Sequence, residues 1–169
     1  SSSGSRRGTP LRGFAFGPTQ HAVADGTAKP LVMPPADTAE IGQTVAAGTQ
    51  ITASGAAVQI IGPHISGPTT GATLSGADSK ILNGYITGAT TGVSMTAART
   101  VCRDMVLGSC TTGVAVGAVA NCVVSGCQGA SNTTDMTINA SATLVRTYNN
   151  VFTTITDSST TVPGSTENT

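Results

Sequence analysis

The stretch "DSKILNGYITGATTGVSMTAA", residues 78–98, contains the pattern that decides the fold. Its threonine pair recurs along the chain at regular intervals, with successive pairs 21, 21, 22 and 20 residues apart. The pairs are Thr69-Thr70, Thr90-Thr91, Thr111-Thr112, Thr133-Thr134 and Thr153-Thr154. Because a constant period of this size is typical of stacked repeats, the sequence predicts a repeat architecture with a unit of about 21 residues.

Within each unit, apolar residues alternate with small or polar ones, as in a short strand with one buried face. The first such segment predicts two buried columns: Ile51, Ala72, Val93, Val114, Met136, and Ala53, Leu74, Met95, Val116, Ile138. A second segment predicts another column of Ile60, Ile81, Cys102, Val123 and Leu144. The unit is too long for a hexapeptide repeat and lacks the helix of a leucine-rich repeat, which leaves a coil of parallel strands.

Residues 78–98 resemble one turn of the right-handed parallel β-helix of pectin-lyase-like proteins and phage tailspikes. The resemblance covers about residues 48–157, or about five turns. It implies an all-β fold, a short right-handed parallel β-helix. In such a coil we expect the TTG sequence to form a corner, where glycine permits a positive φ.

The first 47 residues lack this periodicity. Glycine and proline interrupt residues 1–20, and Pro30, Pro34 and Pro35 continue the extended character. Asp37-Thr38 can cap one short helical turn at most. We therefore expect three segments: an extended N-terminal arm over residues 1–47, a parallel β-helix over 48–157 and a polar C-terminal tail over 158–169.

The composition argues against several classes of partner. Charged residues make up 9% of the chain and the formal net charge is zero, whereas binding nucleic acid through its phosphates needs concentrated Lys and Arg. No apolar run reaches the roughly 18 residues of a membrane span, and the N-terminus lacks the apolar segment of a signal peptide. We expect a soluble protein that is made in a cytoplasm and binds neither nucleic acid nor membrane.

The four cysteines are expected in the core. Cys102, Cys110, Cys122 and Cys127 form no CxxC pair and have no histidine nearby, so small buried hydrophobes are a better interpretation than a zinc site.

Enzymes with the resembled fold cut polysaccharides with paired carboxylates, or with a Ca²⁺ site and a basic residue. The acids of the repeat region are Asp78, Asp104, Asp135 and Asp157. In the repeat register Asp78 aligns with Arg99 and Asp104 with Asn83, so we expect no two acids to stack on each other in adjacent turns. Asp104, next to Arg103, is interpreted as an ion-pair or turn residue.

The two histidines give no clearer sign of catalysis. His21 lies in the arm, and His64 falls in an outward column with Tyr85 and Val106, so a surface or interface role is expected. We therefore expect a protein that is not an enzyme, with no catalytic residue, cofactor or metal.

The outward columns beside the first strand are flat and uncharged. We expect close packing against a second copy there, as in the trimers of phage spikes, with a homotrimer interface formed by Thr52, Ser54, Thr73, Ser75, Ser94 and Thr96. A solvated face is the plain alternative. Ice binding by paired threonine columns is a third interpretation, weakened because Ala115 and Gly117 interrupt the array.

An arm followed by a short β-helix with uncharged sides resembles a virion surface component. The resemblance implies a phage capsid decoration (cement) protein on the capsid surface, made in the host cytoplasm, with the major capsid protein as partner. The arm would anchor it through Arg6, Arg7, Leu11, Arg12, Phe14 and Phe16, unless this segment is only a leader with scattered basic residues. The alternatives are a glycan-binding or depolymerising phage tailspike or fibre fragment, and a bacterial adhesin or scaffold.

Overall fold

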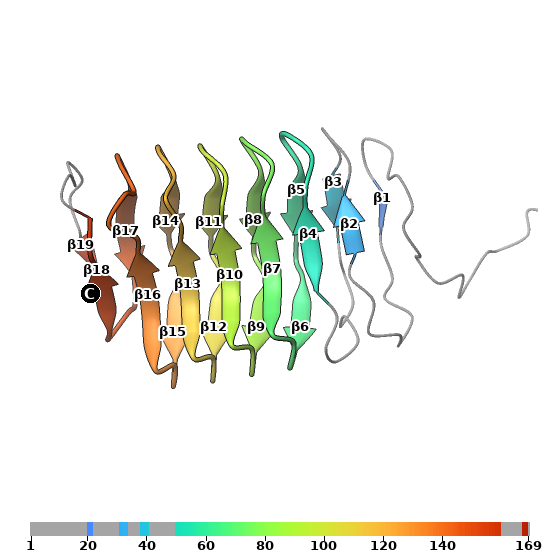
Figure 1. Cartoon of the computed structure of the whole chain (residues 1–169). Helices are drawn as coiled ribbons and strands as arrows, with labels where there is room; N and C mark the ends of the chain where they lie inside the picture. The colour runs from blue at the N-terminus through green and yellow to red at the C-terminus, as the bar shows by residue number, and fades with distance from the viewer. Residues whose placement is uncertain (1–19, 22–30, 34–37, 41–49, 160–166, 169) are drawn as a thin grey trace, which may run out of the picture.

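The structure, a computed structural model, describes residues 20–21, 31–33, 38–40, 50–159 and 167–168. These residues form strands and turns, and none of them lies in a helix. Within this part of the chain no helix is therefore long and apolar enough to cross a membrane. The strands stack into a right-handed coil, a parallel β-solenoid of about five turns (Figure 1). The predicted fold class is confirmed.

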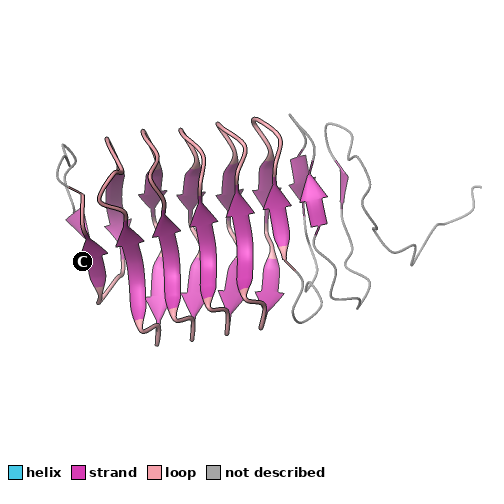
Figure 2. Cartoon of the chain, viewed as in Figure 1, coloured by secondary structure: helices cyan, strands magenta, loops and turns pink. Residues whose placement is uncertain are grey.

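Each full turn contributes one strand to each of three parallel sheets, drawn as magenta arrows in Figure 2. Sheet B consists of β2 (Leu31–Met33), β4 (Ile51–Ala53), β7 (Thr70–Leu74), β10 (Thr91–Met95), β13 (Thr112–Val116), β16 (Thr134–Ile138) and β18 (Ile155–Asp157). Sheet A consists of β1 (Gln20–His21), β3 (Thr38–Glu40), β5 (Gln59–Ile61), β8 (Lys80–Leu82), β11 (Val101–Arg103), β14 (Val123–Ser125), β17 (Arg146–Asn150) and β19 (Glu167–Asn168). Sheet C consists of β6 (His64–Ser66), β9 (Tyr85–Thr87), β12 (Val106–Gly108) and β15 (Gln128–Ala130).

The first two predicted core columns are confirmed. Val93 of β10 pairs with Ala72 of β7 and with Val114 of β13, and Val114 pairs with Met136 of β16. All members of both columns are at most 3% exposed. The alternation of buried and outward residues in sheet B thus follows directly from the period of two along a strand.

The predicted third column is wrong at its last two positions. In sheet A, Cys102 pairs with Val124, and Val124 pairs with Thr147, instead of the expected Val123 and Leu144. The cause is the corner between sheets B and A, which becomes longer from turn to turn. The distance from the last core residue of sheet B to the corner residue with positive φ is four residues from Met95 to Arg99, five from Val116 to Asn121 and six from Ile138 to Leu144. Extra residues in a corner change the number of residues per turn, so a count of 21 along the sequence no longer finds the stacked residue, although the strands themselves stay in register.

Each turn has three corners, and every described corner from β4 to β17 holds one residue with a positive φ, whereas the corner that leads into β18 holds none. At the corner from sheet B to sheet A these residues are Ala57, Asp78, Arg99, Asn121 and Leu144. From sheet A to sheet C they are Gly62, Asn83, Asp104, Gly126 and Asn149, and from sheet C to sheet B they are Gly67, Gly88, Ser109 and Ser131. The left-handed region suits Gly, Asn and Asp best, and these residues fill the second corner completely.

The glycines of the TTG sequences have a different role from the one predicted. Gly71, Gly92 and Gly113 are absent from the residues with positive φ, which lie four residues earlier at Gly67, Gly88 and Ser109. A Cβ on Gly71 would lie 2.7 Å from the carbonyl oxygen of Gly92 and 2.7 Å from the Ile86 side chain. Glycine is required here because the backbones of successive turns approach closely, and not because of φ.

Sheet pairing begins before residue 48, inside the segment expected as an arm. Leu31 of β2 pairs with Ile51, and Ala39 of β3 pairs with Ile60. Thr38 therefore lies in a strand and not in the predicted helical turn, whose other residue, Asp37, lies outside the described residues. At the other end, Glu167 of β19 pairs with Tyr148, within the segment expected as a tail.

The four cysteines are buried and carry no disulfide, as predicted for core residues. Cys102 and Cys127 lie on adjacent turns with their sulfur atoms 3.8 Å apart. The sulfur atom of Cys122 lies 3.3 Å from the hydroxyl oxygen of Thr100, which is also buried. The thiols thus serve as small core residues that also satisfy weak hydrogen bonds.

The core columns predict that shortening a buried side chain lowers stability by a similar amount anywhere along the solenoid. Leu74→Ala and Val116→Ala should each lower the free energy of unfolding by about 1.5–4 kcal/mol, because each leaves a cavity between stacked neighbours. Chemical denaturation measures this loss. Thr112→Ala, on the outward side of the same strand as Val116, is the control and should change stability by less than about 0.5 kcal/mol. Equal effects of Val116→Ala and Thr112→Ala would contradict the assignment of the core side.

Candidate functional surface

The outward side of sheet B is a face of small hydroxyl residues, which we call the hydroxyl face. It is defined by three lines that run across the strands: Thr70, Thr91, Thr112, Thr134; Thr52, Thr73, Ser94, Ala115, Thr137, Thr156; and Ser54, Ser75, Thr96, Gly117, Asn139, Ser158. None of these residues carries a charge. The predicted interface residues Thr52, Thr73 and Ser94 are brought together as direct neighbours, and Ser54, Ser75 and Thr96 follow two residues further along each strand.

Some of these hydroxyl groups are bonded within the protein. Ser75 donates to the carbonyl oxygen of Ala53 at 3.3 Å, and Thr96 donates to that of Leu74 at 3.4 Å. The side-chain amide of Gln50 donates to the hydroxyl of Thr73 at 3.0 Å. Side chains whose polar atoms already have partners lose less when water is removed, so these positions suit a packed contact.

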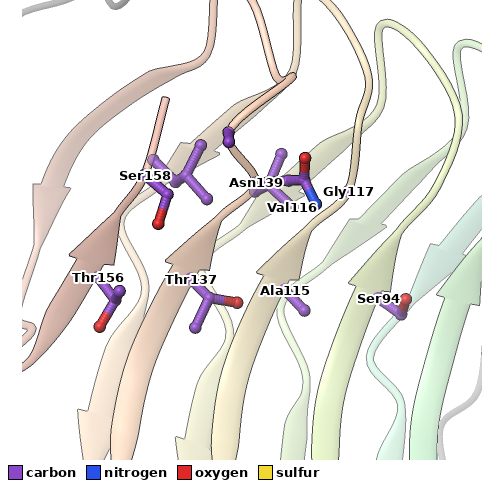
Figure 3. A pocket seen from close by; sticks show the side chains of 10 residues that line it. Ser94, Ala115, Val116, Gly117, Thr137, Asn139, Thr156 and Ser158 are labelled. Carbon is purple, nitrogen blue, oxygen red and sulfur yellow. The ribbon is translucent and has the colours of Figure 1, made fainter. Parts of the chain in front are cut away.

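The face is hollowed where the pattern of hydroxyls is interrupted. Ala115 and Gly117 lie in a hollow of about 540 Å³, with Ser94, Thr137, Asn139 and Thr156 around it (Figure 3). The hollow borders the lengthened corner from sheet B to sheet A, which contributes Gly117 and Ala140 to its lining. The sequence showed the interruption at Ala115 and Gly117, but it did not predict the hollow.

Asp78 and Asp104, two acids of the repeat region, each pair with an arginine. Arg99 donates two hydrogen bonds to Asp78, at 2.6 and 2.9 Å, across adjacent turns as the repeat register predicts. These bonds hold the pKa of Asp78 below its usual value and raise the pKa of Arg99. Asp104 pairs with Arg103 at 3.6 Å and has a φ of 53°, so the predicted ion-pair and turn roles are both confirmed.

Asp135 is a buried acid whose role the sequence did not reveal. It occupies the register position that is glycine in the three preceding TTG sequences, and Gly129 stands where Leu107 and Ile86 fill the preceding turns. A Cβ on Gly129 would meet the carboxylate of Asp135. In this turn a glycine, Gly129, takes the place of the large core residue, and the Asp135 carboxylate fills the space that the glycine leaves.

The Asp135 carboxylate accepts hydrogen bonds from the next turn of the chain. One oxygen accepts from the backbone amides of Thr153 and Thr154, at 2.7 and 3.0 Å, and the other accepts from the side-chain amide of Asn132 at 2.9 Å. Burial opposes ionisation of Asp135, but the hydrogen bonds outweigh it and hold the pKa of this carboxyl below its usual value. Asp135 is therefore a structural acid that fixes the last described turn.

The other predicted groups are placed as follows. His64 is exposed and lies in the outward column with Tyr85, its ring centroid 5.1 Å from that of the tyrosine, as predicted. The arm residues Arg6, Arg7, Leu11, Arg12, Phe14 and Phe16 lie outside the described residues. Among the residues that the structure does describe, no three His, Cys, Asp or Glu side chains form a group that could hold a metal ion.

The bonds to Asp135 predict a pH-dependent loss of stability. Asp135→Asn should lower the free energy of unfolding at pH 7 by about 1–3 kcal/mol for each buried group left without a partner. Because the pKa of the folded state lies below the unfolded value of about 3.9, the carboxylate stabilises the fold above that value and the contribution is lost as the pH falls through the folded pKa. Denaturation at pH 7 and pH 3 measures the difference between wild type and variant, which should shrink at pH 3. Asp157→Asn, at an exposed acid, is the control.

The hydroxyl face predicts sensitivity to a single charge. If the hydroxyl face packs against a second copy, as expected from the sequence, Thr73→Arg and Ser94→Arg should weaken that association, because an unpaired charge in a contact costs several kcal/mol. Sedimentation at micromolar concentration measures the assembly. Thr87→Arg, on the outward side of sheet C, is the matched control. Assembly of both sheet B variants at wild-type affinity would show that the hydroxyl face is solvated.

No protein family model, no curated protein and no solved structure matches this chain.

Proposed function

We propose that the protein is a non-enzymatic structural component of a virus particle, a capsid decoration (cement) protein that forms homotrimers through the hydroxyl face. The observation that supports this most is the hydroxyl face itself, which crosses six strands, β4 to β18, without a charged residue. Such a surface packs against protein without leaving a charge unpaired. Its short side chains also lose little conformational entropy when they become fixed.

The size of the face favours an assembly in which other contacts contribute. Six strands at about 4.8 Å spacing and five residues at about 3.3 Å give a plane of about 24 by 17 Å, or about 400 Å². A stable interface buries about 800 Å² on each partner. The hydroxyl face therefore forms the centre of a contact whose remaining area comes from the flanking corners and from other segments of the chain.

The placement on a virus particle rests on the resemblance to phage tailspikes and on the division of the chain. A short solenoid provides a compact knob, and the segment 1–47 carries Arg6, Arg7, Leu11, Arg12, Phe14 and Phe16 for contacts with the shell. The partner in this proposal is the major capsid protein. The protein would be made in the host cytoplasm and act on the capsid surface.

A glycan-binding tailspike or fibre fragment is the second candidate, and the hollow favours it. Hydroxyl and amide groups of Thr137, Asn139 and Thr156 surround the hollow, and such groups can exchange hydrogen bonds with a neutral sugar. The two candidates compete for the same face, because a copy packed over the hollow would exclude a sugar. Glycan binding by the assembled protein, lost in Gly117→Trp, would favour the second candidate.

The decisive test of the first candidate is association with particles. We expect the protein to co-purify with intact particles in a fixed copy number and to sediment as a trimer at micromolar concentration. A protein that stays monomeric, or that is absent from purified particles, would overturn the proposal.

Removal of residues 1–29 separates the roles of the N-terminal segment and the solenoid. We expect the shortened protein to remain trimeric, because the hydroxyl face is intact, and to bind far fewer copies per particle, because the proposed anchor residues are gone. Sedimentation and quantification of bound copies measure the two properties. Full occupancy on particles would show that the shell is bound by the solenoid alone.

A further inference from the structure

Sheets A and B differ sharply in charge. All four Lys and Arg side chains of residues 50–159 lie in sheet A or at the corner leading into it: Lys80, Arg99, Arg103 and Arg146. With Asp78 and Asp104 at its corners, this side carries four positive and two negative groups, a net charge of +2. The hydroxyl face on sheet B, in front of sheet A in Figure 1, carries none. Glu40 and Glu167 belong to the end strands β3 and β19, outside this stretch.

The cations of sheet A border apolar residues. Along one outward line, Lys80 pairs in register with Val101, Val101 with Val123, and Val123 with Arg146. Both valines are only partly buried. The neighbouring line consists of Leu82, Arg103, Ser125 and Tyr148, of which Leu82 and Ser125 are buried and Tyr148 is 40% exposed. An apolar centre with Arg and Tyr around it is the usual composition of a protein interface.

Two of these cations have no ion-pair partner among the described residues. The ion pairs in this part of the chain are Arg99 with Asp78 and Arg103 with Asp104. Arg103 is 54% exposed and its contact with Asp104 is 3.6 Å, which leaves most of its guanidinium available. Lys80 and Arg146 lie three strands apart, or about 14 Å, on either side of the two valines.

We propose that the outward face of sheet A is a docking surface for an acidic protein surface. Val101 and Val123 would occupy the apolar centre of the contact, and Lys80, Arg103 and Arg146 would pair with carboxylates of the partner. Arginine suits this role because its planar guanidinium binds a carboxylate through two hydrogen bonds. The identity of the partner rests on the proposed function, under which the acidic surface belongs to the shell subunits.

This arrangement separates the two contacts of the protein. A copy packed on the hydroxyl face leaves sheet A open, because the two sheets lie on different sides of the solenoid (Figure 1). The complementary charges would increase the rate of docking and make it sensitive to salt.

The test compares wild type with the triple variant Lys80→Gln, Arg103→Gln, Arg146→Gln on purified particles that lack the protein. We expect association of the triple variant to be slower by about tenfold or more at low salt, since charged surfaces steer association by about this factor. Salt should slow wild type and have a smaller effect on the variant. Arg99→Gln, which removes a cation already paired with Asp78, is the matched control and should slow association much less than the triple variant does. Sedimentation and thermal melting check that each variant assembles and folds.

Association of the triple variant at the wild-type rate would overturn the inference. If wild type itself does not bind particles, the proposed function is wrong, and the inference is decided by retention on immobilised poly-L-glutamate. There the triple variant should elute at clearly lower salt than both wild type and Arg99→Gln. Elution of all three proteins at the same salt concentration would overturn the docking surface.

Discussion

The backbone ladder between successive turns is the interaction on which the rest of the structure depends. Backbone amides along each turn bond to carbonyl groups of the turn before or after it, as Thr91 does to Thr69 and Asp78 to Ala98. Such a ladder continues only if the backbone of each turn bends at the same three corners, so that its strands lie directly over those of the turn before. The three corner residues with positive φ provide this closure, and their amides donate to the following turn. Core columns and surface lines both follow from the closure, because residues that pair in the ladder share a side of the sheet.

The corners absorb the irregularities of the sequence. The lengthened corner between sheets B and A changes the number of residues per turn without moving a core residue of sheet B out of its column, and two of its residues, Gly117 and Ala140, line the hollow beside Ala115. The core absorbs change differently. Gly129 stands where earlier turns have a large residue, and Asp135 stands where they have glycine. The buried Asp135 carboxylate is stabilised because it accepts hydrogen bonds from backbone amides of the next turn. A solenoid can therefore vary locally while its ladder is preserved.

The two faces of the solenoid support different contacts. The hydroxyl face has no charge and short side chains, so the proposed contact there depends on close packing. Sheet A combines an apolar centre with Lys80, Arg103 and Arg146, so the contact proposed there depends on electrostatic complementarity. Under the two proposals, the protein associates with itself and with a larger assembly at the same time. This combination is what the proposed role on a virus shell requires.

The sequence by itself determined the repeat length, the parallel coil, the two core columns of sheet B and the neutral character of its outward face. These features depend on local alternation and on a constant spacing, which the chain displays directly. It also determined the stacking of Asp78 on Arg99, because both lie before the first change in spacing. Only the tertiary structure decided the register of the last turns, where Val124 and Thr147 face inward, since corner length and not strand pattern controls it. It also decided the role of the TTG glycines and of Asp135, because close approach between turns and bonds to distant amides are set by atoms that are far apart in the sequence.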